Sequence, residues 1–207
     1  MFDALIKIGG SLYARPDLPA ITTVWATTAA SHKLILLPGG GPFADQVRAA
    51  DARFHLSHST AHWMAILAMD QYAYLLANLI PQAVLVRDIV TAEDVCTTGR
   101  LAILAPSTLL LQLDPLPHSW QITSDSIAAW LAYYTRIPLL VLLKSIAGVY
   151  SQDSAALLRR VSRQALAQSD VVDAGFVDNL AATTRCWILD GSQPERLPEL
   201  LQQGDTM

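Results

Sequence analysis

Only three lysines occur in the chain, and two of them end predicted strands beside glycine motifs. Lys7 leads into Ile8-Gly9-Gly10-Ser11, and Lys144 precedes a segment that reaches Gly148. Phosphoryl transfer concentrates negative charge on the oxygens of the moving group, so fixed cations aimed at those oxygens are its main catalytic requirement. We therefore predict that Lys7 and Lys144 are catalytic cations. The alternative for each is an ordinary solvated lysine at a strand end.

The glycine motifs add a second kind of phosphate contact. One follows the first predicted strand as Gly9-Gly10-Ser11, and another follows a later strand as Gly39-Gly40-Gly41 before a helix. Glycine lets the backbone approach a ligand and turn its N–H groups toward phosphate oxygens, and a helix N-terminus adds partial positive charge. Two such cradles on one sheet suit a polyphosphate donor facing an acceptor. The competing explanation, tight turns only, fits either motif alone better than the pair.

Two known nucleotide-binding glycine motifs are alternatives for these turns. A P-loop needs Gly-Lys-Ser/Thr, and that tripeptide does not occur in the sequence. Gly39-Gly40-Gly41-Pro42-Phe43-Ala44 fits the loose form of a dinucleotide fingerprint. That fingerprint needs a second strand ending in an acidic residue about 20 positions on, where this chain has the long helical segment Ser57–Leu79. A dinucleotide-binding oxidoreductase is therefore the weaker interpretation.

Short apolar runs alternate with segments of helical period. The expected strands are Ala4–Ile8, Lys33–Leu37, Ala83–Val86, Leu101–Leu104, Leu139–Leu143 and Cys186–Leu189. The expected helices are Asp17–Ala30, Ala44–Ala52, Ser57–Leu79, Asp125–Tyr134, Ser154–Ala167 and Pro194–Gln203. Near-continuous apolar strands need cover on both faces, so the pattern predicts an α/β fold: a three-layer α/β/α sandwich with a mostly parallel open sheet. Ala105–Trp120, broken by prolines, is expected to be a loop across the top of the sheet.

The order of five sequence blocks resembles the amino acid kinase superfamily along nearly the whole chain. The blocks are Lys7-Ile8-Gly9-Gly10-Ser11, Leu37-Pro38-Gly39-Gly40-Gly41, Ile122-Thr123-Ser124-Asp125-Ser126-Ile127-Ala128, Leu143-Lys144-Ser145-Ile146-Ala147-Gly148-Val149-Tyr150 and Val172-Asp173-Ala174-Gly175-Phe176. The resemblance implies an ATP- and Mg²⁺-dependent kinase in which Asp125 organises the catalytic Lys7 and Lys144. We expect no metal site made of protein ligands alone. Mg²⁺ would be bound by the ATP phosphates, and Asp125 could contact it through water.

The same resemblance divides the chain into two sides of one domain, residues 1–207. The acceptor side covers mainly residues 1–120 and the nucleotide side mainly 121–207. The nucleotide and its phosphates are expected at Gly9, Gly10, Ser11, Lys144, Ser145, Gly148, Val149 and Tyr150. The acceptor is expected at Gly39, Gly40, Gly41, Arg48, His62 and Ser124. Arg48 could bind an acceptor phosphate bidentately, although a solvated arginine is an equal alternative.

His55, His58 and His62 lie three and four positions apart, along one helical face. A zinc site is conceivable, but no fourth ligand lies nearby in the sequence. We prefer His62 as a hydrogen-bonding residue near the acceptor pocket, with the other two as ordinary polar residues.

Two positions depart from the family pattern. Ala147-Gly148 stands where Asp-Gly is usual, and Asn179 stands where a second catalytic lysine is usual. Loss of that cation means either that Lys144 takes over the charge, which we favour, or that turnover is impaired. A catalytically weak nucleotide-binding regulator is therefore a rival function.

A narrower resemblance concerns the acceptor. The segment Ala61-His62-Trp63-Met64-Ala65-Ile66-Leu67-Ala68-Met69-Asp70-Gln71-Tyr72, together with Asn179, is similar to the aminomethylfuran phosphate kinases of methanofuran synthesis and their relatives in methylotrophs that use tetrahydromethanopterin. It implies transfer of the γ-phosphoryl group to an (aminomethyl)furanylmethyl phosphate. A phosphate acceptor is already anionic at neutral pH, so no strong general base is required. A kinase of another small phosphate or carboxylate is the alternative.

The composition bounds the partners. The net charge is −4 without a long Lys/Arg run, which argues against nucleic acid and anionic membranes as partners. The start lacks the pattern of a signal peptide, so a cytoplasmic location is expected. Apolar residues make up 52% of the chain and charged residues 15%, an excess that predicts a homo-oligomer with part of its apolar surface in a subunit interface.

Overall fold

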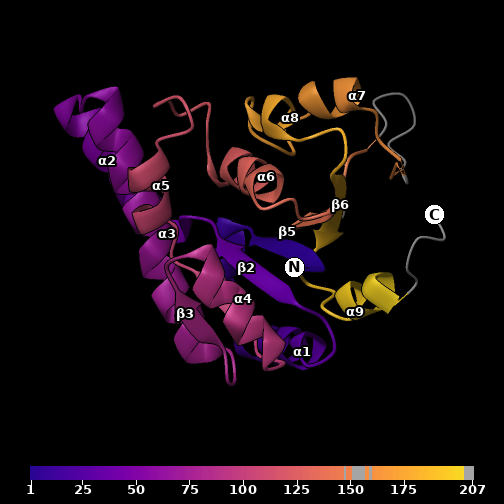
Figure 1. Ribbon diagram of the computed structural model, residues 1–207. Helices are drawn as coiled ribbons and strands as arrows, with labels where there is room; N and C mark the ends of the chain where they lie inside the picture. Colours follow the sequence, from indigo (N-terminus) through magenta and orange to yellow (C-terminus); the bar gives the residue numbers. More distant parts are fainter. Residues whose placement is uncertain (147, 151–156, 159, 203–207) are drawn as a thin grey trace.

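The computed structural model describes residues 1–146, 148–150, 157–158 and 160–202. Six parallel strands form one sheet in the order β3-β4-β2-β1-β5-β6 (Figure 1). The strands are β1 (Ala4–Ile8), β2 (Leu34–Pro38), β3 (Val84–Val86), β4 (Ala102–Leu104), β5 (Leu139–Lys144) and β6 (Arg185–Asp190). The predicted α/β/α class with a mostly parallel sheet is confirmed.

The helices of the described residues lie between these strands and after the last of them. They are the 3₁₀-helix η1 (Gly10–Ala14), α1 (Leu18–Ala29), α2 (Gly41–Phe54), α3 (His58–Leu79), α4 (Ile89–Thr97), α5 (Ser107–Leu113), α6 (Ser124–Tyr134), α7 (Arg163–Ala167), α8 (Phe176–Asn179) and α9 (Arg196–Gln202). Among them, none is long and apolar enough to cross a membrane.

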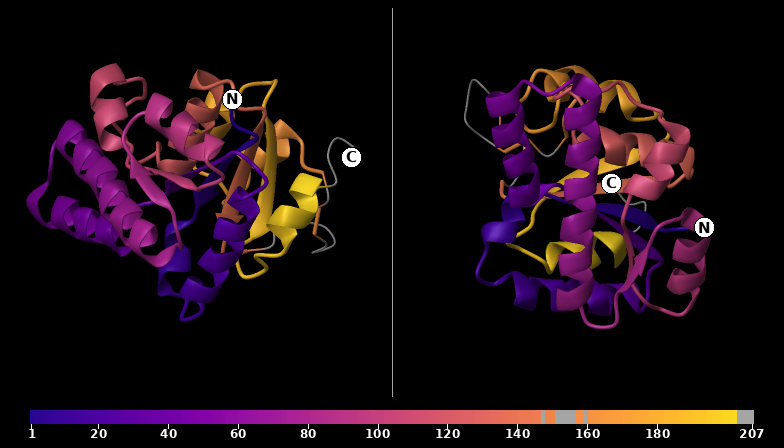
Figure 2. Two further views of the ribbon diagram at one scale, coloured as in Figure 1. Left: turned by 60° about the horizontal axis from the view of Figure 1, so that its bottom comes forward. Right: turned by 90° about the vertical axis from the view of Figure 1, so that its left-hand side faces the viewer.

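The central strands are apolar on both faces because helices cover both faces. Leu5 packs in a core cluster with residues of α4, α5, α6 and α8. Its neighbour Ile6 points to the other face, into a cluster with α1, α9 and the second half of α3. Alternate residues of one strand thus supply two separate cores. Figure 2 shows these helix layers on either side of the sheet, with α2 and α3 packed side by side at one end.

Strand register brings the sequence motifs together at the carboxyl ends of the strands. Ile8, the last residue of β1, lies opposite Pro38 at the end of β2 and opposite Leu143 near the end of β5. The residues that follow these strands therefore emerge side by side at their carboxyl ends. In open parallel sheets, ligands bind at this edge, where consecutive connections diverge.

Two sequence-based expectations were wrong. The predicted loop Ala105–Trp120 contains α5. At the start of this helix, the carboxylate of Asp70 on α3 accepts one hydrogen bond from Ser107 N (3.1 Å) and another from Ser107 Oγ. These bonds stabilise the helix start. The predicted helix Ser154–Ala167 begins only at Arg163, after the capping side chain of Ser162, which accepts a bond from Ala165 N (3.1 Å). Residues 154–156 and 159 of that prediction lie outside the described residues.

The remaining differences are smaller. Helix α2 begins at Gly41, the last glycine of the Gly39-Gly40-Gly41 motif. This is earlier than the predicted start at Ala44. The helix predicted at Pro194–Gln203 is α9, Arg196–Gln202, and residue 203 lies outside the described residues. The short helices η1, α4 and α8 were not predicted.

The buried strands predict a clear stability contrast. Leu142→Ala removes a fully buried side chain from the middle of β5 and should lower the free energy of unfolding by about 2–5 kcal/mol. Leu111→Ala, on α5 at 57% exposure, is the matched control and should change it by less than about 0.5 kcal/mol. Urea denaturation measures both. Equal losses in the two variants would contradict the position assigned to β5.

Candidate active site

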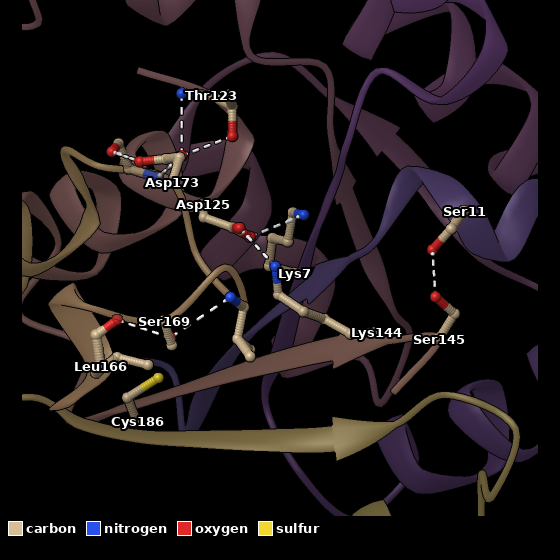
Figure 3. A network of polar contacts seen from close by, with 12 residues as sticks. Lys7, Ser11, Thr123, Asp125, Lys144, Ser145, Leu166, Ser169, Asp173 and Cys186 are labelled. Atoms are coloured by element: carbon tan, nitrogen blue, oxygen red, sulfur yellow. Dashed lines mark hydrogen bonds and ion pairs between the residues drawn. The ribbon is translucent and has the colours of Figure 1, made fainter. Parts of the chain in front are cut away.

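A buried carboxylate joins the two predicted catalytic lysines. Asp125 Oδ1 lies 2.9 Å from Lys7 Nζ, and Asp125 Oδ2 accepts a hydrogen bond of 2.6 Å from Lys144 Nζ. The three side chains come from β1, from the start of α6 and from the end of β5, and Figure 3 shows both ammonium groups turned toward Asp125. Lys7 and Lys144 therefore share one site, as the sequence predicted.

Burial and charge act in opposite directions on this trio. Burial alone would raise the pKa of Asp125, but the charges of Lys7 and Lys144 outweigh it, so the pKa of this carboxyl lies below its usual range. Burial lowers the pKa of Lys144, an effect that Asp125 opposes and the charge of Lys7 reinforces. With both lysines protonated, the trio has one net positive charge, from two ammonium groups and one carboxylate. It is a cationic site in which the lysines are held in place before any anion binds.

The first turn of α6, which carries Ser124 and Asp125, is held by Asp173. One carboxylate oxygen of Asp173 accepts bonds from Thr123 N (3.0 Å), Thr123 Oγ1 (2.6 Å) and Ser126 N (3.0 Å), and the other accepts from Ser126 Oγ. Thr123 is the N-cap residue, yet its own side chain makes no cap bond. Asp173 therefore caps α6 from a distant part of the chain, satisfying donors that a helix start leaves open (Figure 3).

Close packing places Asp173 there. A Cβ atom on Gly175 would lie 2.2 Å from Ile122 Cδ1 and 2.8 Å from Ser126 Oγ, so a larger residue here would have to displace these side chains of the α6 start. Asn179, in the position where the family usually has a lysine, donates from Nδ2 to Gly175 O (2.8 Å). The glycine turn around Gly175 thus packs against α6 and supplies no cation. The second ammonium group on Asp125 is that of Lys144.

The two early glycine motifs pack directly on each other. A Cβ atom on Gly10 would lie 2.7 Å from Gly41 N and 2.8 Å from Gly41 Cα. Two amides of the predicted cradle are already bound within the protein: Gly9 N donates to Leu143 O (2.7 Å) and Gly39 N donates to Ile8 O (2.8 Å). These two amides extend the sheet and are not free for phosphate. The open donors of a helix start lie one residue further, at the beginnings of η1 and α2.

A cavity of about 430 Å³ opens beside these turns. Of the residues predicted to bind the acceptor, Gly40, Gly41, Arg48, His62 and Ser124 line it, and Gly39 does not. Gly10 and Ser11, predicted for the nucleotide phosphates, also reach it. Its remaining walls are largely apolar or aromatic and include Tyr13, Ile66, Met69, Trp120 and Ile127, with the carboxylate of Asp45 as a charged member. The acceptor-side prediction therefore describes one real cavity, although the roles of its residues stay a prediction.

Other predicted nucleotide residues lie at and after the end of β5. Ser11 Oγ donates to Ser145 Oγ (3.1 Å), which ties the first glycine turn to the end of β5. Gly148 has a φ of +143°, Val149 is buried, and Tyr150 is 52% exposed and bridges to Leu157. Ala147, the family departure beside Gly148, lies outside the described residues. The assignment of adenine to this segment stays a prediction.

Sequence reasoning missed the surroundings of His62, which lines this cavity. The ring of His62 stacks on that of His118, with centroids 4.4 Å apart, and His118 Nε2 lies 2.8 Å from Asp114 Oδ1. Burial lowers the pKa of His62, and the charge of His118 lowers it further while Asp114 opposes the shift. His62 is thus a neutral imidazole at pH 7. These tertiary partners lie 52 to 56 positions away in the sequence and left no local signal. Within the described residues, no three His, Cys, Asp or Glu side chains are placed to hold a metal ion.

The parallel sheet and the two lysines paired with one buried carboxylate are those of a phosphotransferase. The sequence pattern of the amino acid kinase family matches residues 4–186, and the chain belongs to this family. A relative from Methanocaldococcus jannaschii, a [5-(aminomethyl)furan-3-yl]methyl phosphate kinase, is 29% identical over 205 residues, which cover 96% of this chain and 92% of the relative.

Solved structures support the same fold. Uridylate kinase from Archaeoglobus fulgidus superposes with a TM-score of 0.74 at 20% identity, covering 98% of this chain and 96% of that one. UMP kinase from Ureaplasma parvum gives a TM-score of 0.68 at 15% identity, with coverage of 98% and 95%. The oxidoreductase interpretation of the Gly39-Gly40-Gly41 motif is therefore wrong, and the chain is a small-molecule kinase.

The cap on α6 predicts a graded response at Asp173. Asp173→Ala leaves four donors without this acceptor and should cost about 1–3 kcal/mol of unfolding free energy, with a fall in kcat as Asp125 loses its fixed position. Asp173→Asn keeps the shape and one accepting oxygen, so it should recover most of the stability. Thermal melting and steady-state kinetics measure the two effects.

The exposed Asp170, three residues earlier, supplies the control. Asp170→Ala should change stability by less than about 0.5 kcal/mol. If Asp173→Ala behaves like Asp170→Ala, the capping role is wrong.

Proposed function

We propose that this chain uses ATP to phosphorylate a small acceptor that already has a phosphate, an (aminomethyl)furanylmethyl phosphate in methanofuran-type cofactor synthesis. The observation that carries the proposal is the pair of ammonium groups on one buried carboxylate, Asp125, whose neighbour Ser124 lines a cavity of about 430 Å³. The Methanocaldococcus jannaschii relative, a kinase of such a phosphate that covers nearly the whole chain, supports the acceptor.

In this proposal Lys7 and Lys144 bind the equatorial oxygens of the transferred group as their charge increases, while Asp125 keeps both nitrogens in place. The donor phosphates would lie along Gly10, Ser11 and Ser145, and the acceptor phosphate would enter from the Gly40-Gly41 side. Since Gly10 packs on Gly41, the two anions would meet at short range, which suits in-line transfer. The acceptor oxygen is already ionised, so the neutral His62 need not act as a base.

Mg²⁺ is expected to arrive on the phosphates of ATP, where it would neutralise part of their charge. Each oxygen of Asp125 already contacts an ammonium nitrogen, and the described residues bring no other group of acidic side chains together for a metal. The contact of Asp125 with Mg²⁺ through water remains a prediction. Binding and orientation of the two substrates therefore fall to the side chains and backbone of the protein.

The rival function, a nucleotide-binding regulator with little turnover, rests on Asn179. Its side-chain amide is bound to Gly175 O and supplies no charge to the site. Lys144 nevertheless gives Asp125 a second ammonium partner, which favours an active kinase.

The working unit we propose is one domain, residues 1–207, in a cytoplasmic homo-oligomer. Leu67 and Tyr74, 49% and 54% exposed on α3, are apolar side chains that a subunit interface would cover. Light scattering measures the mass, and a monomer would contradict this part.

The acceptor is tested by ADP release with ATP and Mg²⁺ over a panel of small phosphates, carboxylates and amines. We expect the (aminomethyl)furanylmethyl phosphate to give the highest kcat/KM and a diphosphate product, identified by mass spectrometry. Binding of ATP without turnover of any acceptor would favour the regulator. A higher kcat/KM for an unrelated carboxylate would identify a different kinase.

The three lysines provide an internal test of the mechanism. Lys144→Ala removes one of the two cations and should lower kcat at least about 100-fold, the loss typical of one preorganised charge contact. Lys33→Ala removes the exposed lysine before β2 and should leave kcat unchanged. An unchanged rate in Lys144→Ala would refute the role proposed for Lys144.

A further inference from the structure

A second cavity with a different character lies next to the acceptor cavity. This smaller space, about 240 Å³, shares the lining residues His62, Ala65, Trp120 and Ile122 with the first. Asp51 on α2 lines it, and it is the only carboxylate among the described lining residues of this second cavity. The second cavity therefore offers one carboxylate, Asp51, beside the imidazoles of His55, His58 and His62.

The two carboxylates along α2 differ in what neutralises them. Asp45 pairs with Arg48 Nη1 at 2.9 Å, and both side chains are more than half exposed. The half-buried Asp51 accepts one hydrogen bond, from the neutral indole Nε1 of Trp120 at 2.7 Å, and has no ion pair among the described residues. The negative charge of Asp51 is thus held in place without a cationic partner. A half-buried carboxylate without a cationic partner is stabilised when a ligand brings a positive charge to it.

Distance along α2 selects Asp51 over Asp45. Ten residues separate Gly41 from Asp51, which is about 15 Å at the helical rise, whereas Asp45 is only about 6 Å from Gly41. In the proposed acceptor, seven bonds of about 1.5 Å join phosphorus to the amine nitrogen, an extended span of roughly 7 Å. Hydrogen bonds of about 3 Å at each end and the length of the aspartate side chain make up the remainder. An acceptor with its phosphate at Gly41 can therefore reach Asp51.

We propose that Asp51 binds the ammonium group of the acceptor and so selects amine-bearing phosphates. This inference rests on the proposed function and names the part of the acceptor that the second cavity recognises. Trp120 orients the carboxylate through its indole N–H and, with His62, provides the aromatic wall between the two cavities. The apolar lining at Ile66 and Met69 suits the ring that lies between phosphate and amine.

The neutral state of His62 is consistent with this role. A protonated imidazole on the path of the acceptor would repel the ammonium group. Burial and the neighbouring His118 keep the pKa of His62 below its ordinary value, so His62 adds no positive charge there at neutral pH.

The test compares two acceptors on two variants. The acceptors are the (aminomethyl)furanylmethyl phosphate and its analogue with a hydroxyl in place of the amine. Asp51→Asn removes the charge but still accepts the Trp120 N–H through its amide oxygen, so it should fold, as thermal melting will show. Asp94→Asn removes the same charge from an exposed position on α4 and is the control.

We expect wild type and Asp94→Asn to prefer the amine in kcat/KM. In Asp51→Asn the KM for the amine should rise about 10-fold or more, with kcat nearly unchanged, and the preference over the hydroxyl analogue should disappear. A preference retained in Asp51→Asn would overturn the inference while leaving the proposed function intact. If wild type phosphorylates neither acceptor, the proposed function is wrong and this inference fails with it.

Discussion

Two ammonium groups share one buried carboxylate, and the arrangement of the elements around Asp125 depends on this contact. A charge removed from water is tolerated only when it is paired, so Lys7, Lys144 and Asp125 stabilise one another in the protein interior. The trio keeps one net positive charge for an incoming phosphate. Its geometry requires β1, β5 and the first turn of α6 to meet at fixed positions, and the neighbouring packing serves this requirement.

The start of α6 links the large cavity to the lysine site. Its first residues give Ser124 to the cavity and Asp125 to the lysines, while Asp173 from the β5–β6 connection caps the same turn. The two early glycine turns are in contact as well, through Gly10 and Gly41.

Asn179 shows how a family framework can keep its geometry while changing its charges. The late turn still packs against α6 through Gly175, but its helix ends in an amide that binds Gly175 O instead of in a cation. The positive charge at Asp125 comes from the ends of β1 and β5. Both strands have a neighbour on each side in the sheet, so these lysines stand on buried strands.

The sequence by itself indicated the strands of the sheet and the two lysines that meet on one carboxylate. Apolar runs marked all six strands, and scarce lysines beside glycine turns marked Lys7 and Lys144, because these signals are local. Tertiary structure alone decided that Asp173 caps α6 from 47 and 50 residues away, that Trp120 orients Asp51 from 69 residues away, and that Asp70 starts α5 in the expected loop. Such hydrogen bonds depend on where the folded sheet places distant segments, so no pattern of neighbouring residues encodes them.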